Sequence, residues 1–175
     1  MAKTAEITFH GGTGSVTGAN FLLEIDGKKI LVDCGLTQGE KLADDINWDP
    51  FVYDPKSIDI LFVTHAHIDH LGRVPKLIAE GFHGKIYSTE PTKALALPML
   101  EDTAGILGKN TDLGLDKIYS PENIKLALSF WQGFTYKQNI KITDNLEVIL
   151  LNAGHILGSA MVEFLYNGKK ILFTG

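Results

Sequence analysis

The chain has 175 residues, of which 45% are hydrophobic and 21% charged, and it carries a net charge of -5 at neutral pH. This composition is typical of one globular domain with a sizeable core, so it excludes a disordered chain. No apolar run approaches the roughly 20 residues of a membrane helix, and the N-terminus lacks the apolar segment of a signal peptide, so we expect a cytoplasmic protein with no membrane partner.

The first third of the sequence alternates short apolar strands with glycine-rich turns. Residues 6–9 (EITF) predict a strand, which leads into a glycine loop at 11–18. The pair Asp26 and Gly27 between two apolar runs is a strong hairpin signal, so residues 20–33 predict two antiparallel strands. The irregular segment 36–57 predicts a long surface loop, and loops of this length are usually functional.

The remainder of the chain mixes strands and helices. Residues 58–64 (IDILFVT) are nearly all apolar and predict a strand buried on both faces. Helices are predicted at 71–82, 90–109 and 121–131, and further strands at 85–89, 145–152, 159–166 and 169–175. Ser120 and Pro121 suit the N-cap and the first position of the third helix. Strands in two groups with helices between them predict a layered α/β fold.

The stretch VTHAHIDHLG, residues 63–72, contains three of the six histidines and an aspartate. Because side chains alternate in an extended chain, His65, His67 and Asp69 are expected to project to one side, while His70, at the turn into a helix, points elsewhere. Imidazole and carboxylate suit zinc, with manganese and iron as alternatives. Four such ligands cannot converge on one ion, so the pattern predicts two adjacent metals that activate water and bind the oxygens of a phosphate or carbonyl.

The other histidines and the single cysteine refine this picture. His155 again follows an apolar strand, and a fold of paired sheets would bring it to the same edge as the cluster. His10 borders the glycine loop and His83 lies in a glycine-flanked turn, and neither is expected to bind metal. Cys34 has no partner for a disulfide, and a cysteine-rich zinc site is excluded.

Three motifs resemble a known family. THAHIDH matches the His-x-His-x-Asp-His signature of the metallo-β-lactamase superfamily. GGTGSVTGANFLLEIDGKKILVDCGLTQG, residues 11–39, and AGHILGSA, residues 153–160, resemble its β-CASP branch, whose nucleases include the bacterial RNase J enzymes and the cleavage and polyadenylation endonuclease. The resemblance covers essentially the whole chain, and it implies a metallo-β-lactamase-type αββα sandwich.

The resemblance also implies roles for individual residues. One zinc ion would be held by His65, His67 and His155, and a second by Asp69 and His70. Asp69 would in addition orient or deprotonate the attacking water. Asp33, at the end of the ILVD strand, matches an aspartate that fixes the orientation of the ligands from behind. Ser159 is placed to contact a phosphate oxygen.

The family pattern continues beyond residue 175 with a bridging aspartate, an inserted β-CASP domain and further histidines. Residues 1–175 are therefore expected to be the N-terminal part of a metallo-β-lactamase domain, an αββα sandwich with an incomplete second half, holding one zinc ion where the longer protein holds two. No run of Lys or Arg is longer than the pairs Lys28-Lys29 and Lys169-Lys170, so the sequence shows no basic patch for nucleic acid. The absent insert would supply the nucleic-acid cleft, so this lack and the acidic net charge are weak evidence against RNA. The unfinished sheet edge at 169–175 would favour a homo-oligomer.

The function implied is that of a ribonuclease in which a zinc-bound hydroxide attacks the phosphorus of single-stranded RNA, with little activity from residues 1–175 alone. One alternative keeps the fold but hydrolyses a small ester, thioester or lactam, against which the SVTG and GHILGSA motifs argue. Another is a non-catalytic scaffold subunit of an RNA-processing complex, against which the intact ligand set argues.

Overall fold

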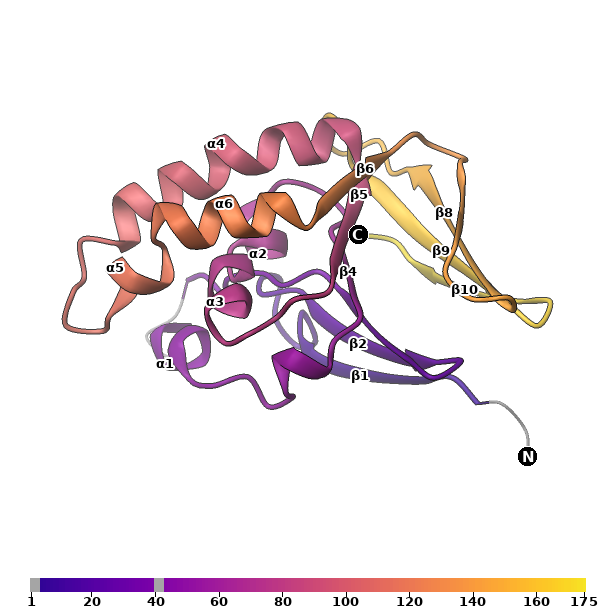
Figure 1. Cartoon of the computed structure of the whole chain (residues 1–175), viewed down its shortest axis with the longest axis horizontal. Coiled ribbons are helices and arrows are strands. Elements are labelled where there is room, and N and C mark those ends of the chain that lie inside the picture. Colours follow the sequence, from indigo (N-terminus) through magenta and orange to yellow (C-terminus); the bar gives the residue numbers. More distant parts are fainter. Residues whose placement is uncertain (1–3, 40–42) are drawn as a thin grey trace.

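The computed structural model describes residues 4–39 and 43–175. Two β-sheets pack face to face, and helices cover the outer face of the larger sheet (Figure 1). The larger sheet has six strands in the order β1-β2-β3-β4-β5-β6, and the smaller sheet has four in the order β10-β9-β8-β7.

In the larger sheet the order of the strands follows the chain. Its strands are β1 (Glu6–Gly11), β2 (Asn20–Ile25), β3 (Lys28–Val32), β4 (Ile60–Phe62), β5 (Lys85–Thr89) and β6 (Trp131–Phe134). The first three strands are antiparallel and β3 to β6 are parallel. The predicted hairpin is confirmed: Asp26 and Gly27, both with positive φ, join β2 to β3.

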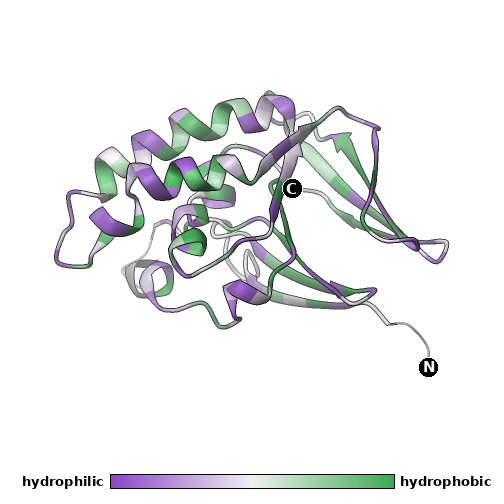
Figure 2. Cartoon of the chain, in the orientation of Figure 1, coloured by the Kyte–Doolittle hydropathy of each residue, from purple (hydrophilic) through white to green (hydrophobic). Residues whose placement is uncertain are grey.

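The smaller sheet is a fully antiparallel meander. Its strands are β7 (Asn139–Lys141), β8 (Leu146–Asn152), β9 (Ala160–Tyr166) and β10 (Lys169–Phe173). Every second residue of β9 is buried, as expected for a strand with one face on a core. Figure 2 shows that hydrophobic residues predominate along β8 and β9. The buried face packs against the inner face of the larger sheet.

The helices form one layer over the outer face of the larger sheet. They are α1 (Ala43–Trp48), α2 (Ile68–Leu71), α3 (Val74–Ala79), α4 (Glu90–Leu107), α5 (Leu115–Ile118) and α6 (Pro121–Ser129), with a 3-10 turn at Pro55–Ser57. Ser120 accepts a hydrogen bond from the backbone of Asn123, which confirms the predicted N-cap of α6. None of the described helices is long and apolar enough to cross a membrane.

The predicted fold class is confirmed. The layers are helices, larger sheet and smaller sheet, and no helix of residues 4–39 or 43–175 covers the outer face of the smaller sheet (Figure 1). This arrangement matches three of the four layers of an αββα sandwich.

Several element boundaries differ from the predictions. The buried strand predicted at 58–64 pairs only over β4. The helix predicted at 71–82 begins only at Val74, as α3, and Leu71 ends the separate short helix α2. The two helices are separate because the Arg73 backbone N–H donates to the Cys34 carbonyl at 2.8 Å and not to a carbonyl of α2. The predicted loop 36–57 contains α1 and the 3-10 turn, and residues 40–42 of it lie outside the described residues.

The helix predicted to reach residue 131 ends at Ser129, and Trp131 begins the unpredicted strand β6. Trp131 is 4% exposed, and its indole N–H donates to the Ser88 hydroxyl at 2.8 Å on the neighbouring strand β5. Pairing with a distant strand, and not the local pattern, sets this boundary. The short strand β7 was also missed.

Candidate metal centre

The histidines gather where the two sheets meet. Thr64 and His65 follow the carboxyl end of β4, and His155 lies in the turn between β8 and β9. The backbone N–H of Ala160 donates to the Thr64 carbonyl at 2.9 Å, so the smaller sheet is hydrogen-bonded to the larger one beside the cluster. The predicted approach of His155 to the other histidines is therefore seen in the structure.

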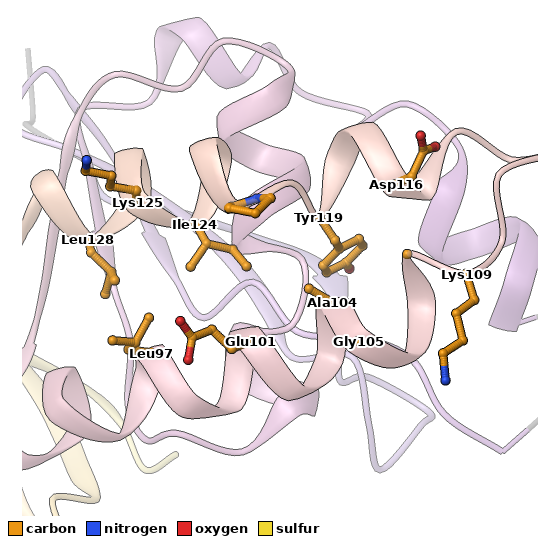
Figure 3. Close-up of a pocket in the computed structure, with 12 residues that line it drawn as sticks. Leu97, Glu101, Ala104, Gly105, Lys109, Asp116, Tyr119, Ile124, Lys125 and Leu128 are labelled. Carbon is orange, nitrogen blue, oxygen red and sulfur yellow. The ribbon is translucent and has the colours of Figure 1, made fainter.

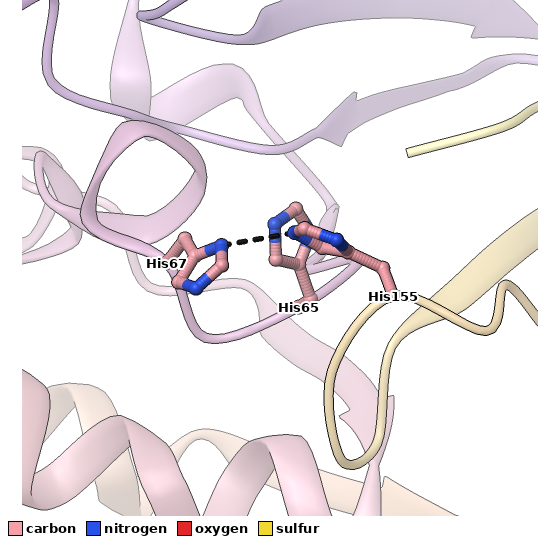
Figure 4. A group of neighbouring side chains, drawn as sticks. All are labelled: His65, His67 and His155. Atoms are coloured by element: carbon pink, nitrogen blue, oxygen red, sulfur yellow. Dashed lines mark hydrogen bonds between the residues drawn. The ribbon is translucent and has the colours of Figure 1, made fainter.

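His65, His67 and His155 form a compact group (Figure 4). Each pair of rings is edge to face with centroids 4.9 Å apart, and one nitrogen from each ring lies within 4.8 Å of the others. His67 Nδ1 and His155 Nε2 are 3.1 Å apart. Two nitrogens bound to one tetrahedral zinc ion at about 2.0 to 2.1 Å lie about 3.3 Å apart, so the donor set suits such an ion.

Asp69 and His70 lie directly beside this group. Asp69 Oδ2 and His70 Nε2 are 3.7 Å apart, and the His70 ring centroid is 3.9 Å from that of His65. The prediction that His70 points elsewhere is wrong. The chain is extended only as far as His67, and α2 begins at Ile68, so its turn carries His70 back against His65.

Backbone hydrogen bonds hold this helical segment in place. The carbonyls of Asp69 and His70 accept from the N–H groups of Ala19 and Cys34 at 3.0 and 2.8 Å. Gly35 lies so close to the Asp69 carbonyl that a Cβ atom there would overlap it. Glycine is therefore required at position 35 for the chain after β3 to pass beneath this helical segment.

Asp33 lies behind the histidines and is fully buried. Its carboxylate accepts from the Thr64 backbone N–H at 2.8 Å and lies 2.8 Å from the Thr64 hydroxyl and 2.7 Å from His70 Nδ1. The backbone of Asp33 has a φ of 61°, which is uncommon for a residue with a side chain. Such conformations persist when surrounding contacts fix them, and they cluster at functional sites.

The site's electrostatics differ between two adjacent rings. Burial, helped by His70, His67 and His155 nearby, lowers the pKa of His65 to about 3, so this imidazole stays in the neutral form that binds metals. Burial would also lower the pKa of His70, but the hydrogen bond and charge of Asp33, together with Asp69, outweigh it and raise that pKa.

Ser159 supports the turn that carries His155. Its side chain is buried, and its hydroxyl accepts from the backbone N–H groups of His155 at 3.0 Å and Ile156 at 3.2 Å. The hydroxyls of Thr89 and Thr92 both donate to the Gly158 carbonyl in the same turn. The threonines, 66 and 69 residues before Gly158, gave no signal in the sequence. The predicted contact of Ser159 with phosphate stays a prediction.

The two remaining histidines lie outside the group of three, as predicted. The His10 ring packs on Tyr53 with centroids 5.0 Å apart. His83 is 3.1 Å from the Gly81 carbonyl in an exposed turn. That neither of these histidines binds metal stays a prediction.

A cavity of about 330 Å³ opens at the cluster and is lined by all five predicted ligands and by Ser159. A larger cavity, about 750 Å³, lies between α4 and α6 (Figure 3). Its walls are mainly apolar, with Leu97, Ile124 and Leu128 among them, and it contains none of the histidines. The smaller cavity is therefore the one that contains the candidate metal ligands.

Comparison with known proteins identifies the family. A model of the metallo-beta-lactamase superfamily domain matches residues 22–174, so the chain belongs to that superfamily. Divalent metal binding follows from this membership. A solved structure, a protein of unknown function from Enterococcus faecalis V583, has a TM-score of 0.67 at 18% identity over 99% of this chain and 43% of that one, which supports the fold alone.

Similar proteins identify the branch of the superfamily that the chain resembles. The chain is 34% identical to Ribonuclease TTHA0252 of Thermus thermophilus and 35% identical to an RNase J-like protein of Methanocaldococcus jannaschii, over 94% and 97% of its residues. It is 32% identical to cleavage and polyadenylation specificity factor subunit 3 of Dictyostelium discoideum. These relatives confirm the resemblance to the β-CASP ribonucleases.

The chain spans 36%, 35% and 21% of the lengths of these three relatives, and 94% of its own residues match the last. The activity and partners of the whole protein are accordingly matters of proposal. That residues 1–175 are the N-terminal part of a longer domain stays a prediction.

Proposed function

We propose that the chain belongs to a zinc-dependent ribonuclease that hydrolyses phosphodiester bonds of single-stranded RNA. The observation that carries this proposal is the convergence of three imidazoles beside an Asp69 and His70 pair, in a chain whose named relatives include ribonucleases. The acidic net charge supports no particular polyanion, so the substrate class rests on the relatives.

The ligands divide into two sets of unequal strength. His65, His67 and His155 would hold one zinc ion, because each can offer a nitrogen to a common point. Asp69 and His70 would hold a second. Two protein ligands leave most of the coordination of that second ion to water, so it should bind more weakly. We expect about one tightly held ion per chain.

When bound, zinc supplies a water of lowered pKa and a positive charge that balances the phosphate. The remaining steps belong to the chain's own residues. Asp69 orients the attacking water or accepts its proton, since its carboxylate lines the cavity and is partly exposed. Asp33 holds His70 in place through the 2.7 Å contact. Ser159 lines the same cavity, and its proposed role is to contact a phosphate oxygen of the substrate.

The metal requirement is tested by elemental analysis of the chain after zinc loading and removal of excess metal. A His65→Ala/His67→Ala variant should lose the tightly held ion. The His83→Ala variant is the matched control, since His83 lies in an exposed turn outside the cluster, and it should retain the ion. Equal zinc in all three proteins would contradict the proposed ligand set.

The substrate is tested with labelled single-stranded RNA and, in parallel, a thioester and a lactam. We expect slow, metal-dependent cleavage of RNA that the His65→Ala/His67→Ala variant lacks, and no hydrolysis of the small substrates. Thioester hydrolysis without RNA cleavage would favour the small-molecule alternative. Zinc binding with no hydrolysis of any substrate by the full-length protein would favour a scaffold role.

We further propose that the protein is cytoplasmic and forms a homo-oligomer, and the edge of the smaller sheet supports the self-association. Within the described residues β10 pairs with β9 on one side only, and Leu172 on it is 46% exposed. Edge strands present backbone groups that pair with another chain. Light scattering should therefore give a mass that rises with concentration, and Leu172→Lys should reduce it. A mass independent of concentration would contradict this part of the proposal.

A further inference from the structure

Thr64 lies between the buried carboxylate and the most buried histidine of the cluster. It is fully buried, and its hydroxyl oxygen is 2.8 Å from Asp33 Oδ2 and 3.0 Å from His65 Nδ1. Thr64 directly precedes His65 in the sequence, and the family resemblance implies no role for it. Within the described residues, the Thr64 hydroxyl is the only side-chain group that forms a hydrogen bond with His65 Nδ1.

Counting protons fixes the direction of these hydrogen bonds. A carboxylate only accepts, so Asp33 takes a proton from each neighbour that has one to give. Thr64 has a single hydroxyl proton, and the 2.8 Å contact directs it to Asp33. The Thr64 oxygen is then left as an acceptor for His65, and that bond requires the proton of His65 to be on Nδ1.

The same carboxylate acts directly on the neighbouring ring. His70 Nδ1 is 2.7 Å from Asp33 Oδ2, so it must carry a proton and donate it. Its other nitrogen, Nε2, faces Asp69 at 3.7 Å. In both rings, therefore, Nδ1 is used for a hydrogen bond and Nε2 is the nitrogen with a free lone pair.

We propose that Thr64 is a positioning residue: its hydroxyl relays the acceptor character of Asp33 to His65, so that one buried carboxylate fixes the tautomer of both His65 and His70. Both rings then present Nε2 to metal ions. The consequence for metal binding rests on the proposed function above, but the tautomers do not. His67 and His155 lie outside this hydrogen-bond network, because the ring hydrogen bond that they make joins His67 Nδ1 to His155 Nε2.

Only the hydroxyl of Thr64 serves the relay. Its backbone N–H donates to Asp33 Oδ1 at 2.8 Å and its carbonyl accepts from Ala160, and both bonds survive any change of side chain. Thr64→Val keeps the shape and removes the hydroxyl, whereas Thr64→Ser keeps the hydroxyl. Thr103→Val is a matched control, because Thr103 is also a buried threonine whose hydroxyl bonds to a carbonyl, that of Met99 in α4, away from the cluster.

The first measurement is long-range nitrogen-proton NMR of the imidazoles in the metal-free chain at mildly alkaline pH. The unmodified chain and Thr64→Ser should show His65 and His70 protonated on Nδ1. In Thr64→Val the Nδ1 proton of His65 has no acceptor, so His65 should shift toward the Nε2-protonated form while His70 does not. Thr103→Val should match the unmodified chain.

The second measurement is zinc affinity by competition with a chelator. Groups that hold a ligand's other nitrogen typically contribute about 10 to 100-fold to affinity, so we expect about a 10-fold loss in Thr64→Val and recovery in Thr64→Ser. Circular dichroism establishes that each variant is folded. If Thr64→Val does not fold, the tautomer of His65 in the unmodified chain still decides the question.

Two outcomes overturn the relay. One is an Nε2-protonated His65 in the unmodified chain. The other is a folded Thr64→Val variant whose His65 tautomer and zinc affinity both equal those of Thr103→Val. If instead the proposed metal centre is wrong, NMR would show the Nδ1-protonated tautomers of His65 and His70 in a chain that binds no zinc.

Discussion

The two sheets hold their histidines by different means. His65, from the larger sheet, is 4% exposed and backed by Thr64 and the buried Asp33 carboxylate. His155, from the smaller sheet, is exposed and belongs to a turn whose backbone is held by the Ser159 hydroxyl. In the larger sheet the imidazole itself is fixed, whereas in the smaller sheet only the backbone beneath it is fixed. We infer that the larger sheet determines the geometry of the centre and that the smaller sheet closes it.

The largest effect is expected from removing the buried carboxylate. Asp33→Ala would leave the Thr64 hydroxyl and His70 without their buried acceptor, and loss of one member of such a network costs about 3 kcal/mol of unfolding free energy. Zinc affinity should fall about 10 to 100-fold without being abolished. Urea unfolding and chelator competition measure the two effects.

The control for this change is Asp144→Ala, since Asp144 is an exposed carboxylate in a surface ion pair with Lys141. A change there should stay within about 0.5 kcal/mol. If Asp33→Ala were as mild as Asp144→Ala in both measurements, the claim that the larger sheet determines the geometry of the centre would be wrong.

A smaller effect is expected in the turn of the smaller sheet. Ser159→Ala removes the acceptor of two backbone N–H groups, which should cost about 1 to 2 kcal/mol of unfolding free energy. Because His155 keeps its place in the chain and is exposed, zinc affinity should fall less than in Asp33→Ala. A greater loss of zinc affinity in Ser159→Ala than in Asp33→Ala would reverse the comparison.

The smallest effect at neutral pH concerns Cys34, which follows Asp33 and is fully buried. Burial raises the pKa of its thiol from 9.0 to about 11, so thiol reagents should react with it far more slowly in the folded chain than in the unfolded one. Rapid labelling of the native chain would show that the larger sheet is open to solvent here.

The raised pKa of the Cys34 thiol also makes folding stability depend on pH in alkaline solution. From about pH 9 to about 11 the unfolded thiol loses its proton while the folded one keeps it, so folding stability falls as pH rises through this window. The contribution of this pKa shift to folding stability is about 3 kcal/mol. Stability curves of the unmodified chain and Cys34→Ala should therefore converge toward alkaline pH, and parallel curves would contradict the burial of this residue.

Much of the site could be predicted because it is encoded locally. The spacing of His65, His67, Asp69 and His70 is contained in six residues, and the Asp26 and Gly27 turn determines a hairpin without help from elsewhere. The gathering of His155 with the cluster required only that the two sheets meet at one edge. Residue type and short spacing carry enough information for such features.

The rest depends on partners that are distant in the sequence. The direction of His70 follows from the start of α2 and from Asp33, 37 residues earlier. The relay through Thr64 joins residues 31 apart, and the contacts of Thr89 and Thr92 with Gly158 span more than 60. Strand β6 exists because Trp131 packs beside β5. A local sequence pattern carries no information about contacts between residues so far apart in the chain.

The central claim is that His65, His67 and His155 bind one zinc ion. X-ray absorption at the zinc edge of the loaded chain tests it most directly, with the His65→Ala/His67→Ala variant beside it. We predict about one tightly held ion per chain with nitrogen ligands at about 2.0 to 2.1 Å and the scattering pattern of several imidazoles, all lost in the variant. Zinc surrounded by oxygen ligands alone, or the same imidazole pattern in the variant, would contradict the claim.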